Sequence, residues 1–128
     1  MSDPYCRILY VDDHDDSAEM MKLLLAPMNY EVHSARTIEE ALQSARTESF
    51  DLYVLDKRLP DGSGIELCRK LNVLTPGVPC IFYTGDAYEI HRQEAAAAGA
   101  HAYISKPDVE SLIETVHKFL TERGCAVA

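Results

Sequence analysis

The feature that most constrains the fold is a regular alternation of short apolar runs with amphipathic segments of helical period. Runs rich in strand-forming residues are each followed by a segment in which apolar residues recur every three or four positions. The runs are residues 6–11, 30–35, 51–56, 78–83 and 102–105, and the helical segments cover about 16–28, 37–46, 63–74, 87–99 and 109–120. Because right-handed crossovers place helices on both faces of a parallel sheet, this order predicts a doubly wound α/β domain with a five-stranded parallel sheet.

The third run indicates where such a sheet would carry its chemistry. Residues 52–55 are Leu, Tyr, Val and Leu, without the polar alternation of a strand that faces water. The run ends on Asp56, which would emerge at the carboxyl end of a buried strand. Open α/β sheets bind their ligands at that edge.

Several residues predict where helices begin and end. Capping boxes, with a Glu three positions after the cap, begin at Thr37 and Ser63. Asp86 is expected to cap the fourth helix from residue 87, and Gly99 to end it in a left-handed conformation.

Length and composition predict one domain. The chain has 128 residues, of which 47% are hydrophobic, enough for one sizeable core. We expect a single domain over residues 1–128, with a core of about 5–121 and with 122–128 as a fraying tail or the start of a linker.

Charge and hydropathy limit the partners. A formal net charge of -9 argues against direct binding to nucleic acid or to an anionic membrane surface. The sequence contains no apolar run long enough to span a membrane and no charged, apolar leader, so we expect a cytoplasmic protein.

The four cysteines, Cys6, Cys68, Cys80 and Cys125, lie far apart in the sequence and form no CxxC pair. This spacing favours neither a zinc site nor a closely spaced redox pair. The first three sit in apolar runs, where we expect them to pack as small hydrophobic side chains.

Polar residues follow four of the five predicted strands. Asp12 and Asp13 follow the first, Asp56 the third, Thr84 the fourth and Lys106 the fifth. The carboxyl ends of parallel strands share one edge of the sheet, so these side chains should gather there. Neighbouring carboxylates repel one another unless a divalent cation lies between them, and oxygen ligands suit Mg²⁺ or Mn²⁺.

The same set suits phosphoryl transfer. Lys106 supplies a positive charge and Thr84 a hydroxyl group, and both can stabilise an anionic group beside the metal. A carboxylate nucleophile in such a site forms an aspartyl phosphate.

These residues resemble the receiver domain of two-component response regulators over nearly the whole chain. The matching segments are Val11-Asp12-Asp13, Leu55-Asp56 with Leu59-Pro60 and Gly64, Tyr83-Thr84-Gly85, Gly99-Ala100 and Tyr103-Ile104-Ser105-Lys106-Pro107. The resemblance implies a flavodoxin-like fold with strand order 2-1-3-4-5 and a site between strands one and three.

The resemblance also implies roles for the site residues. Asp56 would accept the phosphoryl group from a phosphohistidine of a sensor histidine kinase or phosphotransfer protein. Asp13, Asp56 and the backbone carbonyl of Arg58 would hold Mg²⁺, with Asp12 acting through water.

A second set of roles concerns switching. Lys106 would pair with a phosphoryl oxygen, Thr84 would move in to bond another, and Tyr103 would follow into the space that Thr84 leaves. The surface of the fourth helix, fifth strand and fifth helix would then change for a downstream protein or a fused output domain. The family also implies a cis bond between Lys106 and Pro107.

Arg58 and Asp86 depart from the commonest family pattern and would flank the approach of the hydrolytic water. We expect them to form an ion pair that slows autodephosphorylation; the alternative is two solvated charges that do not interact.

Other interpretations remain open at this stage. A haloacid-dehalogenase-type phosphatase also uses an aspartyl phosphate, but it needs a second Asp where this chain has Arg58. A flavodoxin-like electron carrier needs a phosphate loop where Asp12 and Asp13 stand. A degenerate receiver that works by protein contact alone is disfavoured because every acceptor-site residue is present. Separately, Asp12 and Asp13 could merely cap the first helix, an interpretation that the presence of Asp56, Thr84 and Lys106 disfavours. Tyr103 could be an ordinary half-buried strand residue, since its switching role follows only from the resemblance.

Overall fold

The computed structural model describes residues 6–125, which form a parallel sheet with helices on both faces. The sheet strands are β1 (Cys6–Val11), β2 (Tyr30–Ala35), β3 (Leu52–Leu55), β6 (Cys80–Thr84) and β7 (Ala102–Ser105). Their order, β2-β1-β3-β6-β7, confirms the expected doubly wound, flavodoxin-like arrangement. A short antiparallel hairpin, β4 (Arg58–Leu59) and β5 (Gly62–Ser63), follows the Asp56 strand and was not predicted.

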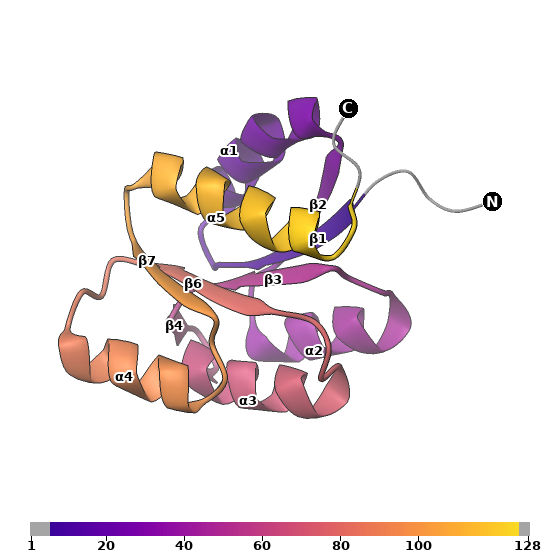
Figure 1. The fold of residues 1–128 in the computed structure, drawn as a ribbon. Coiled ribbons are helices and arrows are strands. Elements are labelled where there is room, and N and C mark those ends of the chain that lie inside the picture. Colours follow the sequence, from indigo (N-terminus) through magenta and orange to yellow (C-terminus); the bar gives the residue numbers. More distant parts are fainter. Residues whose placement is uncertain (1–5, 126–128) are drawn as a thin grey trace.

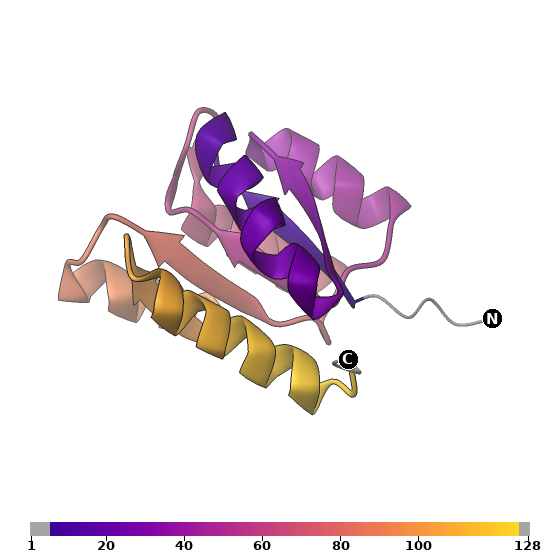
Figure 2. The same ribbon diagram turned by 90° about the horizontal axis from the view of Figure 1, so that it is seen from above.

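Helices cover the sheet in two layers. They are α1 (Asp15–Leu25), the 3₁₀ turn η1 (Ala26–Met28), α2 (Ile38–Thr47), α3 (Gly64–Leu74), α4 (Glu89–Ala97) and α5 (Val109–Glu122). Helices α1 and α5 lie on one face, and α2, α3 and α4 lie on the other (Figures 1 and 2). Within residues 6–125, every helix is too short or too polar to cross a membrane.

Strand side chains divide the core between the two faces. Leu9 and Val11 of β1 point into the cluster under α2, α3 and α4, whereas Ile8 and Tyr10 point into the cluster under α1 and α5. All the side chains of β3 are buried, as its unbroken apolar run predicts. The sheet is therefore packed against helices on both faces.

The predicted helix boundaries are mostly confirmed. The Thr37 hydroxyl accepts from the Glu40 amide at 3.0 Å and the Ser63 hydroxyl from the Ile65 amide at 3.1 Å. Gly99 adopts a φ of 103° directly after α4. The prediction for the start of α4 was wrong: the helix begins at Glu89 and Tyr88 is its N-cap. The Asp86 carboxylate accepts the Tyr88 amide at 3.1 Å, which forms a turn before the helix rather than its cap.

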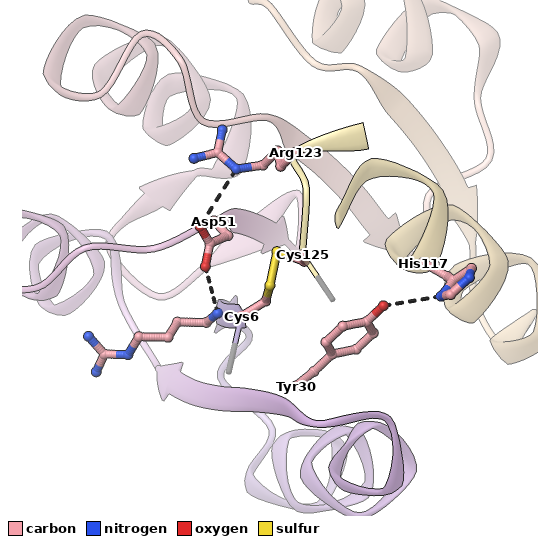
Figure 3. The surroundings of a disulfide bond; sticks show 7 residues. Cys6, Tyr30, Asp51, His117, Arg123 and Cys125 are labelled. Carbon is pink, nitrogen blue, oxygen red and sulfur yellow. Dashed lines mark hydrogen bonds and ion pairs between the residues drawn. A yellow bond between two sulfur atoms is a disulfide. The ribbon is translucent and has the colours of Figure 1, made fainter. Parts of the chain in front are cut away.

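The cysteines follow the prediction only in part. Cys68 and Cys80 are free and buried, as expected. Cys6 is not a simple core residue, since it forms a disulfide with Cys125, 119 positions away (Figure 3). Of the predicted tail, residue 122 ends α5 and Cys125 is covalently held, while residues 126–128 lie outside the described part of the chain.

Gly64 lets the segment after β3, residues 56–63, fold back tightly onto the start of α3. Its amide donates to the Lys57 carbonyl at 2.7 Å, and a Cβ at this position would collide with the backbone carbonyl of Asp56. Only a residue without a side chain fits so close to the backbone of Asp56.

We therefore predict that Gly64→Ala lowers the free energy of unfolding by about 1–3 kcal/mol, because the backbone of the loop must shift. Urea denaturation measures this change. Gly77→Ala is the matched control, since a Cβ there meets no atom within 4 Å, and it should change stability by less than about 0.5 kcal/mol. Equal effects of the two substitutions would contradict the proposed steric role of Gly64.

Candidate functional site

Backbone hydrogen bonds extend the sheet ladder one residue beyond the strand ends. The Asp12 amide donates to the carbonyl of Ala35 at 3.1 Å, and the Asp56 amide donates to that of Val11 at 2.9 Å. The Lys106 amide donates to the Thr84 carbonyl at 2.8 Å. The side chains that follow β1, β3 and β7 are thereby aligned at one edge, as the sequence predicts.

The centre of this edge is a lysine shared by two carboxylates. Lys106 Nζ lies 2.8 Å from Asp12 Oδ2 and 3.2 Å from Asp56 Oδ2. Asp12 is only 2% exposed and Asp56 only 9%. Such buried charges are stable only when they are paired, so the ammonium group is required to hold the carboxylates together.

Asp12 has further partners that tune its charge. The Tyr10 hydroxyl donates to Asp12 Oδ2 at 3.0 Å, and the His14 amide donates to Oδ1 at 3.0 Å. Burial acts to raise the pKa of Asp12, but hydrogen bonds from Lys106 and His14 outweigh it and hold the pKa below its usual value. Asp12 is therefore a permanent anion at neutral pH.

The pKa of Lys106 is raised, whereas that of Asp12 is lowered, so both shifts favour the charged forms. Burial acts to lower the pKa of Lys106, while the hydrogen bond to Asp12 and the charge of Asp56 raise it above its usual value. The side chain is a fixed cation at the base of the site.

The acidic side chains form a set that suits a hard cation. Oxygen atoms of Asp12, Asp13 and Asp56, with a ring nitrogen of His14, all lie within 4.8 Å of one another. Three carboxylates with one ammonium leave an excess of negative charge, and oxygen donors are what Mg²⁺ prefers. The donor set therefore fits the expected metal.

The edge is open to solvent through a depression of about 500 Å³. Its walls bring together most of the predicted site residues; Asp12 and Tyr103 are not among the lining residues. The lining consists of Asp13, His14, Asp56, Arg58, Thr84, Gly85, Asp86, Tyr88 and Lys106.

Tyr103 does not line this depression but contacts Asp86, which does. Its hydroxyl donates to the backbone carbonyl of Asp86 at 2.6 Å, and its ring stacks on Phe82 with centroids 5.8 Å apart. The Asp86 amide in turn donates to the Thr84 hydroxyl at 3.3 Å. The backbone of Asp86 thus links Thr84 to Tyr103 through two hydrogen bonds. Burial, together with the nearby Asp86, raises the pKa of Tyr103 to about 12, so its hydroxyl remains a donor.

The expected ion pair between Arg58 and Asp86 was wrong. The Asp86 carboxylate pairs with Lys57 Nζ at 3.5 Å and with His91 Nδ1 at 2.6 Å. The Arg58 side chain is exposed and lines the depression separately. Lys57 points inward to the loop after β6 and occupies the position that Arg58 was expected to take.

Several functional contacts were missed by the sequence reasoning. The Tyr10 hydroxyl donates to Asp12, and both Lys57 and His91 pair with Asp86. The Asp61 carboxylate accepts the Ile38 amide at 2.8 Å and so ties the segment after β3 to α2. Tyr10 alternates with Leu9 and Val11 and reads as core, and nothing in the local pattern distinguishes Lys57 from a solvated lysine.

Comparison with known proteins agrees with this geometry. Residues 8–117 match the response regulator receiver domain. The chain belongs to the response regulator receiver domain family. It is 35% identical to the response regulator protein PilR of Pseudomonas aeruginosa over 119 aligned residues. This alignment covers 92% of this chain and 27% of PilR. It is 36% identical to the regulatory protein VanR of Enterococcus faecium over 101 aligned residues. This alignment covers 79% of this chain and 43% of VanR.

Solved receiver domains share the fold. A CheY-like receiver domain protein from Methanospirillum hungatei superposes with a TM-score of 0.88 at 37% identity, over 94% of this chain and 97% of that one. The response regulator protein TrrA from Thermotoga maritima, solved in complex with Mg²⁺-BeF, gives a TM-score of 0.80 at 32% identity, over 90% and 99% of the two chains. This receiver domain is therefore a regulatory module consistent with phosphorelay signalling in two-component systems.

The contact between His91 and Asp86 affects the pKa of the Asp86 carboxyl group. The hydrogen bond from His91 is the main cause that holds the pKa of the Asp86 carboxyl below its usual value, with Lys57 contributing. A lowered carboxyl pKa gives stability that is present above the ordinary Asp pKa of about 4 and is lost as pH falls through the lowered value. His91→Ala should therefore raise the pKa of Asp86.

Carboxyl NMR titration of wild type and His91→Ala measures this shift. Asp61 is the internal control, because its pKa is lowered by the Ile38 and Glu39 amides and should not change. An Asp86 pKa that is the same in both proteins would contradict the assigned contact.

Proposed function

We propose that Asp56 is the phosphoacceptor of this receiver domain and takes its phosphoryl group from a phosphohistidine of a sensor histidine kinase or phosphotransfer protein. The observation that carries the proposal is the sharing of Lys106 between Asp12 and Asp56 at the carboxyl edge of the sheet. A nearly buried carboxylate that lines an open depression, with a cation beside it, is suited to attack a phosphorus atom.

In the reaction, an Asp56 oxygen forms a bond to phosphorus as the bond from phosphorus to the donor imidazole nitrogen breaks. The released imidazole takes up a proton from solvent. Lys106 can exchange its contact with Asp56 for one with a phosphoryl oxygen, since it remains anchored by Asp12 at 2.8 Å. The Thr84 hydroxyl faces the same depression and can donate to another phosphoryl oxygen.

A divalent cation completes the site in this proposal. Asp13, Asp56 and the backbone carbonyl of Arg58 would hold Mg²⁺, with Mn²⁺ as a substitute, and Asp12 would act through water. When bound, the cation neutralises charge on the carboxylates and on the incoming phosphoryl group.

The contacts around Asp86 support a switching role for Thr84 and Tyr103. If Thr84 moves toward a phosphoryl oxygen, it must release or pull the Asp86 amide, and the Asp86 carbonyl is the acceptor of the Tyr103 hydroxyl. A change at the acceptor is thus passed to the surface of α4, β7 and α5.

This surface is where a downstream protein or a fused output domain would bind. The chain spans 27% and 43% of the length of PilR and VanR. The net charge of -9 favours a protein partner over direct binding to nucleic acid or membrane. We place the domain in the cytoplasm, where sensor kinases have access to ATP. Its own catalysis is limited to its phosphorylation and dephosphorylation.

The test of the acceptor is incubation with acetyl phosphate and Mg²⁺, followed by intact mass measurement. Wild type should gain one phosphoryl group and Asp56→Asn should gain none. Asp61→Asn is the matched control: this carboxylate lies in the same loop but caps α2, so the variant should still be labelled. An unlabelled wild type, under conditions that label a known receiver, or a labelled Asp56→Asn would overturn the proposal.

Arg58 and Asp86 line the depression through which the hydrolytic water must approach, and we propose that they modulate its access. Since Arg58 does not pair with Asp86, its effect comes from its own bulk and charge. Arg58→Ala should lose its phosphoryl group about threefold faster than wild type, a small effect because exposed side chains contribute about 1 kcal/mol or less.

The decay of phosphorylated protein, followed by mass after removal of acetyl phosphate, measures this rate. Arg58→Lys keeps a long cation and should stay close to wild type. An Arg58→Ala rate that is equal to or slower than the wild-type rate would contradict the role of Arg58.

A further inference from the structure

The disulfide between Cys6 and Cys125 lies at the edge of the sheet opposite the acceptor site. Cys6 begins β1, whereas Asp12 follows the other end of the same strand. Cys125 comes directly after α5, and the two Cα atoms are 6.0 Å apart, well within the range of protein disulfides. Figure 3 shows the bond between the start of β1 and the segment that leaves α5.

Noncovalent contacts hold Cys125 near Cys6 independently of the sulfur–sulfur bond. Arg123 donates to the Gly77 carbonyl at 2.7 Å and pairs with Asp51 at 3.7 Å. Asp51 in turn accepts the Arg7 amide at 2.8 Å, next to Cys6 (Figure 3). These contacts tie the end of α5 to the start of β1, so the two thiols would remain close after reduction and could close again at high effective concentration.

The turn after α5 directs the chain toward Cys6. Gly124 has a φ of 87°, and the Cys125 amide donates to the Leu120 carbonyl at 2.9 Å. This is a left-handed helix end that glycine favours. The turn is local and does not depend on the disulfide.

The other two cysteines provide a contrast within the same chain. Cys68 and Cys80 are free and fully buried, and contact with Cys68 together with burial raises the pKa of the Cys80 thiol. A small oxidant cannot reach them in the folded protein. Of the disulfide pair, Cys6 is buried and Cys125 is only half-buried, so Cys125 is the more exposed residue.

A metal site is the rival interpretation of this cluster. Ligand atoms of Cys6, Asp51 and Cys125 lie within 4.8 Å of one another. A structural zinc site needs four protein ligands, and within residues 6–125 the cluster holds only these three. Asp51 already accepts the Arg7 amide and pairs with Arg123, so its carboxylate is occupied.

We propose that Cys6 and Cys125 are a reversible redox modification site, closed by a small-molecule disulfide such as glutathione disulfide and opened by thiols. In a compartment that keeps most thiols reduced, a disulfide is typically transient and responsive. Closure fixes the end of α5 to the start of β1 and leaves the acceptor edge unchanged. This inference does not depend on the proposed phosphoacceptor role.

The closing reaction proceeds by two thiol–disulfide exchanges. The Cys125 thiolate attacks one sulfur of glutathione disulfide, forms a mixed disulfide and releases a glutathione thiolate. The Cys6 thiolate then attacks the Cys125 sulfur and displaces the second glutathione thiolate. The two protein sulfurs lose two electrons, the glutathione disulfide gains them, and the protons from the protein thiols pass to the two glutathione thiolates.

The experiment equilibrates the full chain in glutathione buffers of increasing oxidised fraction, quenches it with an alkylating agent under denaturing conditions and counts free thiols by mass. We expect four alkylated cysteines at the reduced end and two at the oxidised end, with Cys68 and Cys80 as the two that remain. The thermal midpoint of the oxidised protein should be at least about 5 °C higher than that of the reduced protein, because the bond closes a loop of 119 positions.

Two variants and one local readout complete the test. Cys6→Ser and Cys125→Ser should each show the same thermal midpoint in both buffers, whereas Cys68→Ala should keep the wild-type difference. Amide hydrogen exchange at residues 121–125 should be at least tenfold slower in the oxidised protein, while exchange in β3 is unchanged at matched stability. Labelling by acetyl phosphate should reach the same extent in both redox states.

Three outcomes would overturn the inference. One is a count of four free thiols at every glutathione ratio, and another is a bond that no ratio opens. The third is a reduced protein whose thermal midpoint rises with Zn²⁺ in wild type but not in Cys125→Ser, which would assign the cluster to metal binding instead.

Discussion

The carboxyl edge of the sheet, where Asp12, Asp56 and Lys106 meet, depends on the ion pairs that the Lys106 ammonium group makes with the two carboxylates. The ammonium group lies between Asp12 after β1 and Asp56 after β3, and it comes from the segment after β7, so one side chain connects the ends of three strands. Without it, two nearly buried carboxylates would face each other in a region of low dielectric. The backbone ladder places these residues, but their charge balance makes the arrangement stable. The same balance leaves a net negative charge that favours a divalent cation.

Much of the fold and the acceptor edge was predictable, because both follow from local patterns. A short unbroken apolar run such as 52–55, placed between two helical segments, favours a strand covered on two faces, and parallel strands bring Asp12, Asp56 and Lys106 to the same edge. The Thr37 cap and the glycine at 99 act within a single turn, so their residue types suffice. These features need no knowledge of which distant side chains meet.

The features that could not be predicted depend on the directions of long side chains or on contacts between distant segments. Lys57 and Arg58 are adjacent cations in the sequence, but the chain direction after β3 turns Lys57 toward Asp86 and Arg58 toward solvent. Asp86 looks like a helix cap, but its carboxylate accepts the Tyr88 amide and contacts His91, and α4 begins only at Glu89. The pairing of Cys6 with Cys125 requires the register of the whole sheet and the length of α5. No local pattern carries that information.

In the proposed site, Asp12, Asp13 and Asp56 form one electrostatic unit that a divalent cation completes. The most direct measurement is the thermal midpoint of the unphosphorylated domain as a function of Mg²⁺ concentration. The midpoint of wild type should rise steadily once Mg²⁺ exceeds its dissociation constant, because the cation binds the folded state. Asp13→Asn should lose this rise, while Asp108→Asn, which removes an exposed capping carboxylate at the start of α5, should keep it. A wild-type midpoint that does not respond to Mg²⁺, or an equal rise in Asp13→Asn, would contradict the account.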